Sequence, residues 1–142
     1  MSKLTRVVSI DEFELFTDCT KSELRRLSSL TTYLEVPKDR VLMRQGSQAT
    51  EFIVIGSGTA TVTRETDGGV ATVANVGSGE FLGGMSLLTG NRRTVTAVAT
   101  SDLTVLVSSL SEFRAMLEIV PSLEQKVRQN SVVARADLGT AA

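Results

Sequence analysis

Residues 79–97 read GEFLGGMSLLTGNRRTVTA, and this stretch interrupts a long series of predicted strands. Five of the eleven glycines of the chain lie in it or just before it, at positions 77, 79, 83, 84 and 90. The pair Gly83-Gly84 precedes a short predicted helix, whose first backbone N–H groups can bind an anion. Arg93 follows at the head of the next predicted strand, where its planar guanidinium could hold two oxygens of the same anion. Glycines that serve only to turn the chain are the alternative interpretation.

Short apolar segments rich in Val, Ile and Thr lie on both sides of this stretch, between residues 32 and 108. They recur about every 8–12 residues, a spacing typical of an antiparallel sandwich or barrel. The predicted strands are Tyr33–Val36, Val41–Arg44, Phe52–Ile55, Thr59–Glu65, Val70–Val76, Thr94–Ala99 and Leu103–Val107. In the fourth strand Ala60 and Val62 face one way and the threonines face the other, and Asp67-Gly68 predicts the tip of a hairpin.

Predicted helices flank the strands. Three helix starts have the spacing of a capping box, in which a Ser or Thr is followed three residues later by Glu. These pairs are Ser9 with Glu12, Thr20 with Glu23, and Ser109 with Glu112.

Two helices are predicted after the last strand. The first has an apolar face with helical spacing, made of Phe113, Met116, Leu117 and Val120. Pro121 ends it, because proline cannot continue a helix. Ser122 is the predicted cap of the final helix, which runs from Leu123 through Val127 toward Val132 or Val133.

Composition excludes several classes of function. The chain has 142 residues, 15 basic and 16 acidic side chains, and a formal net charge of −1. With no histidine and one cysteine, Cys19, it offers neither a Ser-His-Asp nor a Cys-His arrangement and no zinc cluster. We therefore expect neither an enzyme nor a metal site.

The charge balance and hydropathy also restrict the partners. A nucleic-acid module usually has a basic surplus, so direct binding of nucleic acid is not expected. No apolar run approaches the roughly 18–20 residues of a membrane span, and the first residues lack the apolar stretch of a signal peptide. We therefore expect a cytoplasmic protein that makes no membrane contact.

The order of these elements resembles the cyclic nucleotide-binding domain of the catabolite activator and protein kinase regulatory-subunit family. The resemblance extends from about Phe16 to Leu123. Comparable residues stand at Phe16, Leu24, Leu27, 43–46, 52–55, 79–83 and 93–96. It implies a mainly β fold, an antiparallel β-sandwich or jelly-roll barrel with flanking helices. The single expected domain, 1–142, then comprises a helical segment at 9–31, a β-roll at 32–108 with a phosphate-binding cassette at 79–97, and C-terminal helices at 109–137.

The resemblance also assigns a ligand site. In the family, cassette amides and an arginine hold the cyclic phosphate, which here implies amide donors from Gly83, Gly84, Met85 and Ser86 and a phosphate contact from Arg93. Thr94 is expected either to touch the ligand or only to fill a strand position. A surface ion pair is the alternative role for Arg93.

One position departs from the family pattern. The family has a glutamate that binds the ribose 2′-hydroxyl, and this chain has Gly84 there. Loss of such a charged hydrogen bond is expected to weaken binding by roughly 10-fold to 150-fold. Gly84→Glu is then expected to strengthen it. Glu80, four positions earlier, is expected to point to solvent and not to substitute.

The resemblance predicts a stand-alone sensor that binds cyclic AMP in preference to cyclic GMP and needs no other cofactor. Ligand would move the helix at 110–120 and the one after Pro121, whose side chains at 128–131 are candidates to face the base. The signal would pass to another chain, either a protein partner or a second copy bound through the final helix. The alternative is a degenerate domain that acts as a protein-interaction module with weak or no nucleotide binding.

Overall fold

The computed structural model describes residues 13–131, and its centre is the apolar run that begins at Phe52. Phe52 and Val54 pack with the helices, whereas Ile53 and Ile55 pack between the two sheets. Side chains alternate across a strand, so a strand that is buried on both faces reads as continuously apolar. This run therefore joins the two hydrophobic clusters of the protein.

Eight strands within residues 13–131 form two antiparallel four-stranded sheets, in the orders β1-β8-β3-β6 and β2-β7-β4-β5. The strands are β1 Thr32–Val36, β2 Val41–Met43, β3 Glu51–Ser57, β4 Ala60–Thr66, β5 Gly69–Val76, β6 Phe81–Leu82, β7 Thr96–Ala99 and β8 Leu103–Ser109. The helices are η2 Glu14–Phe16, α2 Lys21–Ser29, α3 Gly84–Thr89, α4 Leu110–Ile119 and α5 Ser122–Asn130. The predicted β-sandwich with flanking helices is confirmed.

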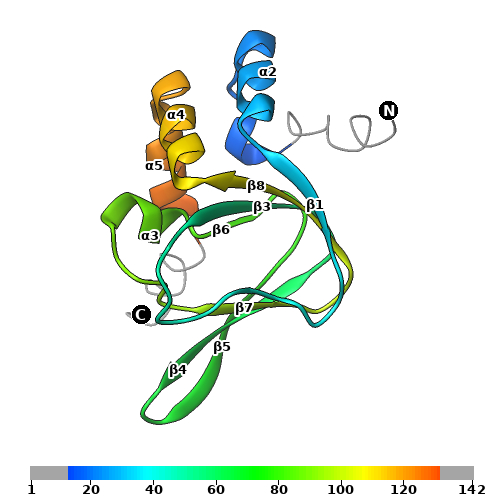
Figure 1. Ribbon diagram of the computed structural model, residues 1–142, viewed down its shortest axis with the longest axis vertical. Coiled ribbons are helices and arrows are strands. Elements are labelled where there is room, and N and C mark those ends of the chain that lie inside the picture. The colour runs from blue at the N-terminus through cyan, green and yellow to red at the C-terminus, as the bar shows by residue number, and fades with distance from the viewer. Residues whose placement is uncertain (1–12, 132–142) are drawn as a thin grey trace.

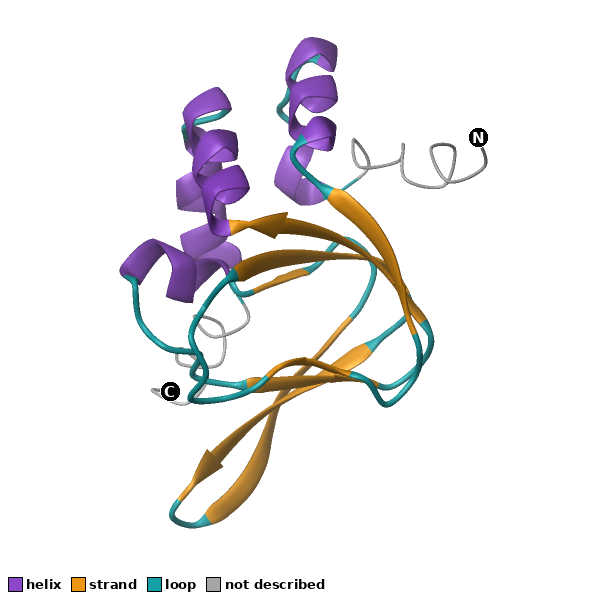
Figure 2. Ribbon diagram, in the orientation of Figure 1, coloured by secondary structure: helices purple, strands orange, loops and turns teal. Residues whose placement is uncertain are grey.

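The helices gather on the side of the sheet that contains β3 and β8, and the β4–β5 hairpin projects from the opposite end (Figures 1 and 2). Ala60 and Val62 are fully buried, as their alternation predicts. Strand bounds differ from the predicted ones by one or two residues. The sequence prediction missed β6, a two-residue strand that pairs with β3 at the start of the cassette.

The capping signals have mixed outcomes. Both capping boxes that fall on described residues form, at Thr20 with Glu23 and at Ser109 with Glu112. Ser9 with Glu12 lies outside the described residues, as do the predicted helical positions from 132 onward. The prediction for Ser122 is wrong: it is the first residue of α5, and Pro121, which has no side-chain donor or acceptor, occupies the cap position.

Candidate functional site

Arg93 is buried, with only 5% of its surface exposed, and its guanidinium joins two distant parts of the backbone. Nη2 donates a hydrogen bond to the carbonyl oxygen of Glu51 at 2.7 Å, and Nη1 donates to that of Gly83 at 3.0 Å. Burial lowers the pKa of Arg93 from its ordinary value, and the Glu51 carboxylate partly opposes that shift. The guanidinium therefore ties the start of β3 to the start of α3, and it forms no ion pair with another residue of the described range 13–131.

Gly83 allows this close contact. It is the N-cap of α3 and has a φ of 93°, in the left-handed region that favours glycine. A Cβ atom at Gly83 would lie 2.6 Å from Nη1 of Arg93 and 2.7 Å from the Glu51 carbonyl oxygen. No side chain caps α3. Residue 83 must therefore be glycine if Arg93 is to bind the backbone here.

Gly84 has a different role from the one inferred from sequence. It is buried beneath α5, and a Cβ atom on it would lie 2.5 Å from Cγ1 of Val127 and 3.2 Å from Cε1 of Phe52. A glutamate has no space here while α5 keeps this position. The effect of Gly84→Glu on nucleotide affinity stays a prediction, and it requires α5 to move away from residue 84.

All six residues assigned to the ligand site line one small cavity. They are Gly83, Gly84, Met85, Ser86, Arg93 and Thr94, and they are joined there by Met43, Phe81, Leu82, Val95 and Ser131. The cavity has a volume of about 20 Å³. Ligand pockets usually measure about 300–1,000 Å³, whereas a single water needs roughly 10–15 Å³. The site as it stands has room for a water molecule and not for a nucleotide.

The last helix closes this cavity. Ser131, just after α5, is buried and lines it, and Val127 covers Gly84 from the same helix. Lys126, also in α5, forms an ion pair with the exposed Asp18, with Nζ 2.9 Å from Oδ2. Sequence reasoning proposed residues 128–131 for this region without choosing among them. It missed Val127, Met43 and the Glu51 carbonyl, which carry no local signal of a ligand site.

Glu80 and Thr94 of the cassette both differ from their sequence predictions. Glu80 does not simply point to solvent: it is half-buried, and its Oε1 accepts a hydrogen bond from the Gly77 N–H at 2.9 Å. Thr94 lies before β7 and not within a strand, since β7 begins at Thr96. The backbone of Arg93 is tied to the loop between β2 and β3, because its N–H donates to the Ser47 carbonyl at 2.9 Å.

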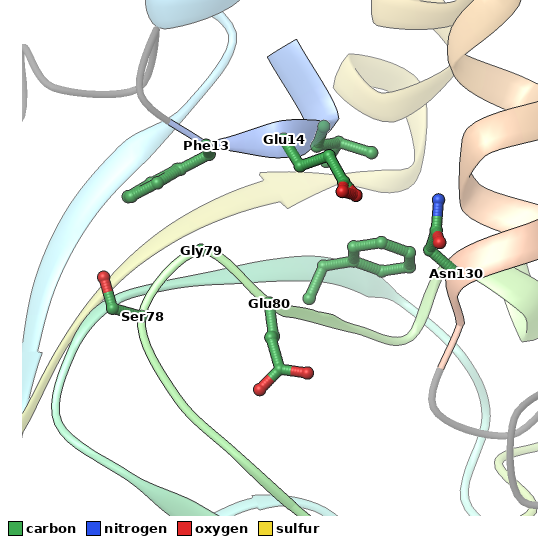
Figure 3. A pocket seen from close by; sticks show the side chains of 8 residues that line it. Phe13, Glu14, Ser78, Gly79, Glu80 and Asn130 are labelled. Atoms are coloured by element: carbon green, nitrogen blue, oxygen red, sulfur yellow. The ribbon is translucent and has the colours of Figure 1, made fainter. Parts of the chain in front are cut away.

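A second cavity, of about 390 Å³, lies on the far side of Phe81. Figure 3 shows Glu14 and Asn130 directed toward the same opening, while Glu80 points away from them. The residues that line it include two carboxylates and no basic side chain. Carboxylates repel a phosphate, so this cavity does not suit the anion predicted for the cassette.

Other kinds of site find no support among the residues from 13 to 131. No group of three His, Cys, Asp or Glu side chains in this range is placed to hold a metal ion. Burial is the main cause that raises the pKa of the Cys19 thiol, which makes it a poor nucleophile. None of the described helices is long and apolar enough to cross a membrane.

The sequence model of the cyclic nucleotide-binding domain family matches residues 33–119 of this chain. The chain belongs to this family. A cyclic nucleotide-binding-like protein from Brucella abortus has a solved structure that is 35% identical, with a TM-score of 0.65, over 78% of this chain and 97% of that one. The acetyltransferase Pat of Mycolicibacterium smegmatis is 31% identical over 130 residues, which are 90% of this chain. The cAMP-dependent protein kinase regulatory subunit of Mycosarcoma maydis is 29% identical over 69% of this chain.

The two sequence relatives are much longer than this cyclic nucleotide-binding domain. The chain spans 39% of the length of the acetyltransferase and 19% of that of the kinase regulatory subunit. The resemblance predicted from the cassette and the strand order is thus confirmed at the level of the family and the fold. The absence of an enzymatic activity stays a prediction.

Proposed function

We propose that this chain binds a cyclic nucleotide, cyclic AMP in preference to cyclic GMP, at the cassette cavity. One observation carries the proposal: the six residues that the family resemblance assigns to the ligand line a single cavity with a buried arginine. The two hydrogen bonds of Arg93 use two of the five N–H donors of a guanidinium, so others are available to a phosphate. Cyclic AMP is favoured because a relative is named as a cAMP-dependent regulatory subunit.

Binding requires the cavity to open, and α5 is the element that must move. Val127 and Ser131 lie over the cassette, so a sugar phosphate can enter only when the C-terminal end of α5 moves off Gly84. The ligand would thereby favour an open arrangement over the closed one. Part of the free energy gained from phosphate contacts must offset the cost of displacing this helix. The more stable the closed state is, the weaker the apparent affinity for the nucleotide becomes.

Movement of α5 is also the proposed output. Leu123 and Val127 of α5 belong to the same hydrophobic cluster as Phe113 and Met116 of α4, so a shift of one helix changes the packing of the other. The chain would pass this change to another protein or to a second copy through the final helix. Such coupling needs only differential affinity of the ligand for the two arrangements.

A second candidate function rests on the closed cavity. Gly84 stands where the family has the carboxylate that binds the ribose, and the same glycine leaves space for Val127 of α5 to pack against it. A domain with these two features could act as a protein-interaction module with weak or no nucleotide binding.

Isothermal titration calorimetry of the full chain with cyclic AMP and cyclic GMP distinguishes the two candidates. The sensor proposal expects heat with cyclic AMP that is lost in Arg93→Lys and kept in Arg92→Ala, which alters an exposed neighbour. Circular dichroism melting verifies that each variant is folded. Absence of binding by the wild-type chain at millimolar cyclic nucleotide contradicts the sensor proposal and favours the interaction module.

A further inference from the structure

Strand β2 forms one edge of the sheet β2-β7-β4-β5, since it pairs with β7 alone; it is three residues long, and its register with β7 shifts between Val41 and Met43. A shallow groove of about 640 Å³ runs along it, lined by Lys38–Arg44 and Ser47. Val41 and Leu42 are half-buried and line the groove, and Leu42 also packs against the hydrophobic cluster between the sheets. An edge strand directs part of its backbone N–H and C=O groups away from its sheet, where another extended chain can pair with them.

Cationic side chains line this groove. Lys38, Arg40 and Arg44 are all exposed, and none of them forms an ion pair with another residue of the described range 13–131. Asp39 is the one carboxylate among the lining residues. Arg92 adds a further positive charge near the end of β2, because its Nη1 donates to the Gly46 carbonyl at 3.2 Å. The edge therefore has a positive surplus in a chain whose net charge is −1.

The opposite edge of the same sheet is different. Strand β5 has no charged residue from Gly69 to Val76. On the side of β4 that faces β7 rather than β5, the amide of Gln45 pairs with the backbone of Glu65: Nε2 donates to the Glu65 carbonyl at 2.9 Å, and the Glu65 N–H donates to Oε1 at 2.7 Å. Among the described residues, the β2 edge of this sheet therefore carries cations without an ion-pair partner, which the β5 edge lacks, and a surface of this kind selects partners by charge.

We propose that the β2 edge binds an extended acidic segment of another protein by strand addition. Backbone hydrogen bonds to β2 would supply the register, and carboxylates of the segment would pair with Lys38, Arg40 and Arg44. A polypeptide fits better than a nucleic acid, because only a polypeptide can continue the hydrogen-bond ladder of the edge. The proposal does not depend on nucleotide binding, since the groove is open while the cassette cavity is closed.

The test uses a short fluorescein-labelled peptide of alternating glutamate and valine, with the full chain and fluorescence anisotropy as the readout. Saturable binding that weakens at higher salt is expected. Reversing two charges, in Arg40→Glu/Arg44→Glu, should weaken it by about tenfold or more, because each attraction becomes a repulsion. The matched control is Arg25→Glu/Arg26→Glu, which reverses two exposed charges on α2 and should leave the affinity unchanged. Melting temperatures verify that both double variants fold.

Strand addition has its own control. The same peptide, N-methylated throughout its central half, keeps its charges but loses backbone donors, and it should bind at least about tenfold more weakly. Equal affinity for the methylated and unmethylated peptides would overturn the proposal. An equal loss of affinity in the β2 double variant and in the α2 control variant would also overturn it. No binding of the unmodified peptide at millimolar concentration would also overturn it. So would tighter binding of duplex DNA that depends on Arg40 and Arg44.

Discussion

Val127 of α5 occupies the space in which a side chain at Gly84 would begin, since a Cβ atom there would lie 2.5 Å from Cγ1 of Val127. This contact links the departure from the family pattern at residue 84 to the position of the last helix. The glycine therefore both removes a ligand contact and stabilises the closed arrangement of the site. If the chain binds a cyclic nucleotide as proposed, both effects are expected to lower its affinity.

Substitution of Gly84 is expected to destabilise the protein. Gly84→Ala should lower the free energy of unfolding by about 1–3 kcal/mol, because the added methyl overpacks the contact with Val127 and Phe52. Urea unfolding followed by circular dichroism measures the loss. Gly77→Ala is the matched control, since a Cβ there would meet only the Gly58 carbonyl oxygen at 3.7 Å. A Gly84→Ala variant as stable as the Gly77→Ala variant would contradict close packing of Val127 against Gly84.

Arg93 is expected to stabilise the fold whether or not a ligand is present. Arg93→Ala leaves the carbonyl oxygens of Glu51 and Gly83 without their buried donor, which should cost about 1–3 kcal/mol for each unsatisfied group. Arg92→Ala, at an exposed position, should change the free energy of unfolding by less than about 0.5 kcal/mol. Chemical denaturation of both variants without ligand checks the difference. Equal stabilities would mean that the buried guanidinium contributes nothing to the fold.

Val127→Ala is expected to ease opening of the cassette. Val127 is fully buried, so truncation should lower overall stability by about 1–3 kcal/mol. If the closed state loses about 1.4 kcal/mol of this, the apparent affinity for cyclic AMP should rise about tenfold. Amide exchange in α5 should become faster, and calorimetry should detect the tighter binding. Val105→Ala removes the same atoms from the cluster between the sheets. It should lower the free energy of unfolding and leave the affinity for cyclic AMP unchanged. An affinity gain shared by both variants would argue against α5 as the closing element.

The two serines at the start of the C-terminal helices should respond differently to alanine. Ser109→Ala should cost about 0.5–2 kcal/mol, because the Ser109 hydroxyl accepts a hydrogen bond from the Glu112 N–H at 3.2 Å. Ser122→Ala should stay within about 0.5 kcal/mol, since α5 has no side-chain cap. Thermal or urea unfolding compares them. A similar loss for both would indicate that Ser122 caps α5 after all.

Local signals in the sequence predicted most of the architecture. The capping boxes at Thr20 and Ser109, the alternation of Ala60 and Val62, and the hairpin at Asp67-Gly68 depend on neighbours a few residues apart. Strand β6 was missed because two residues are too few to show a period, and it forms by pairing with β3. The cap at Ser122 was wrong because residue type alone does not establish where the chain enters a helix.

Local sequence patterns were enough to predict the β-sandwich, the flanking helices, the family and the residues that line the cassette cavity. Tertiary structure alone decided that Arg93 binds the backbone of Glu51, 42 residues away, and that α5 rests on Gly84 and closes the cavity. The difference lies in how far apart in the sequence the interacting residues are. Periodicity and capping describe interactions within one element, whereas these contacts depend on how distant elements pack, which no local pattern specifies.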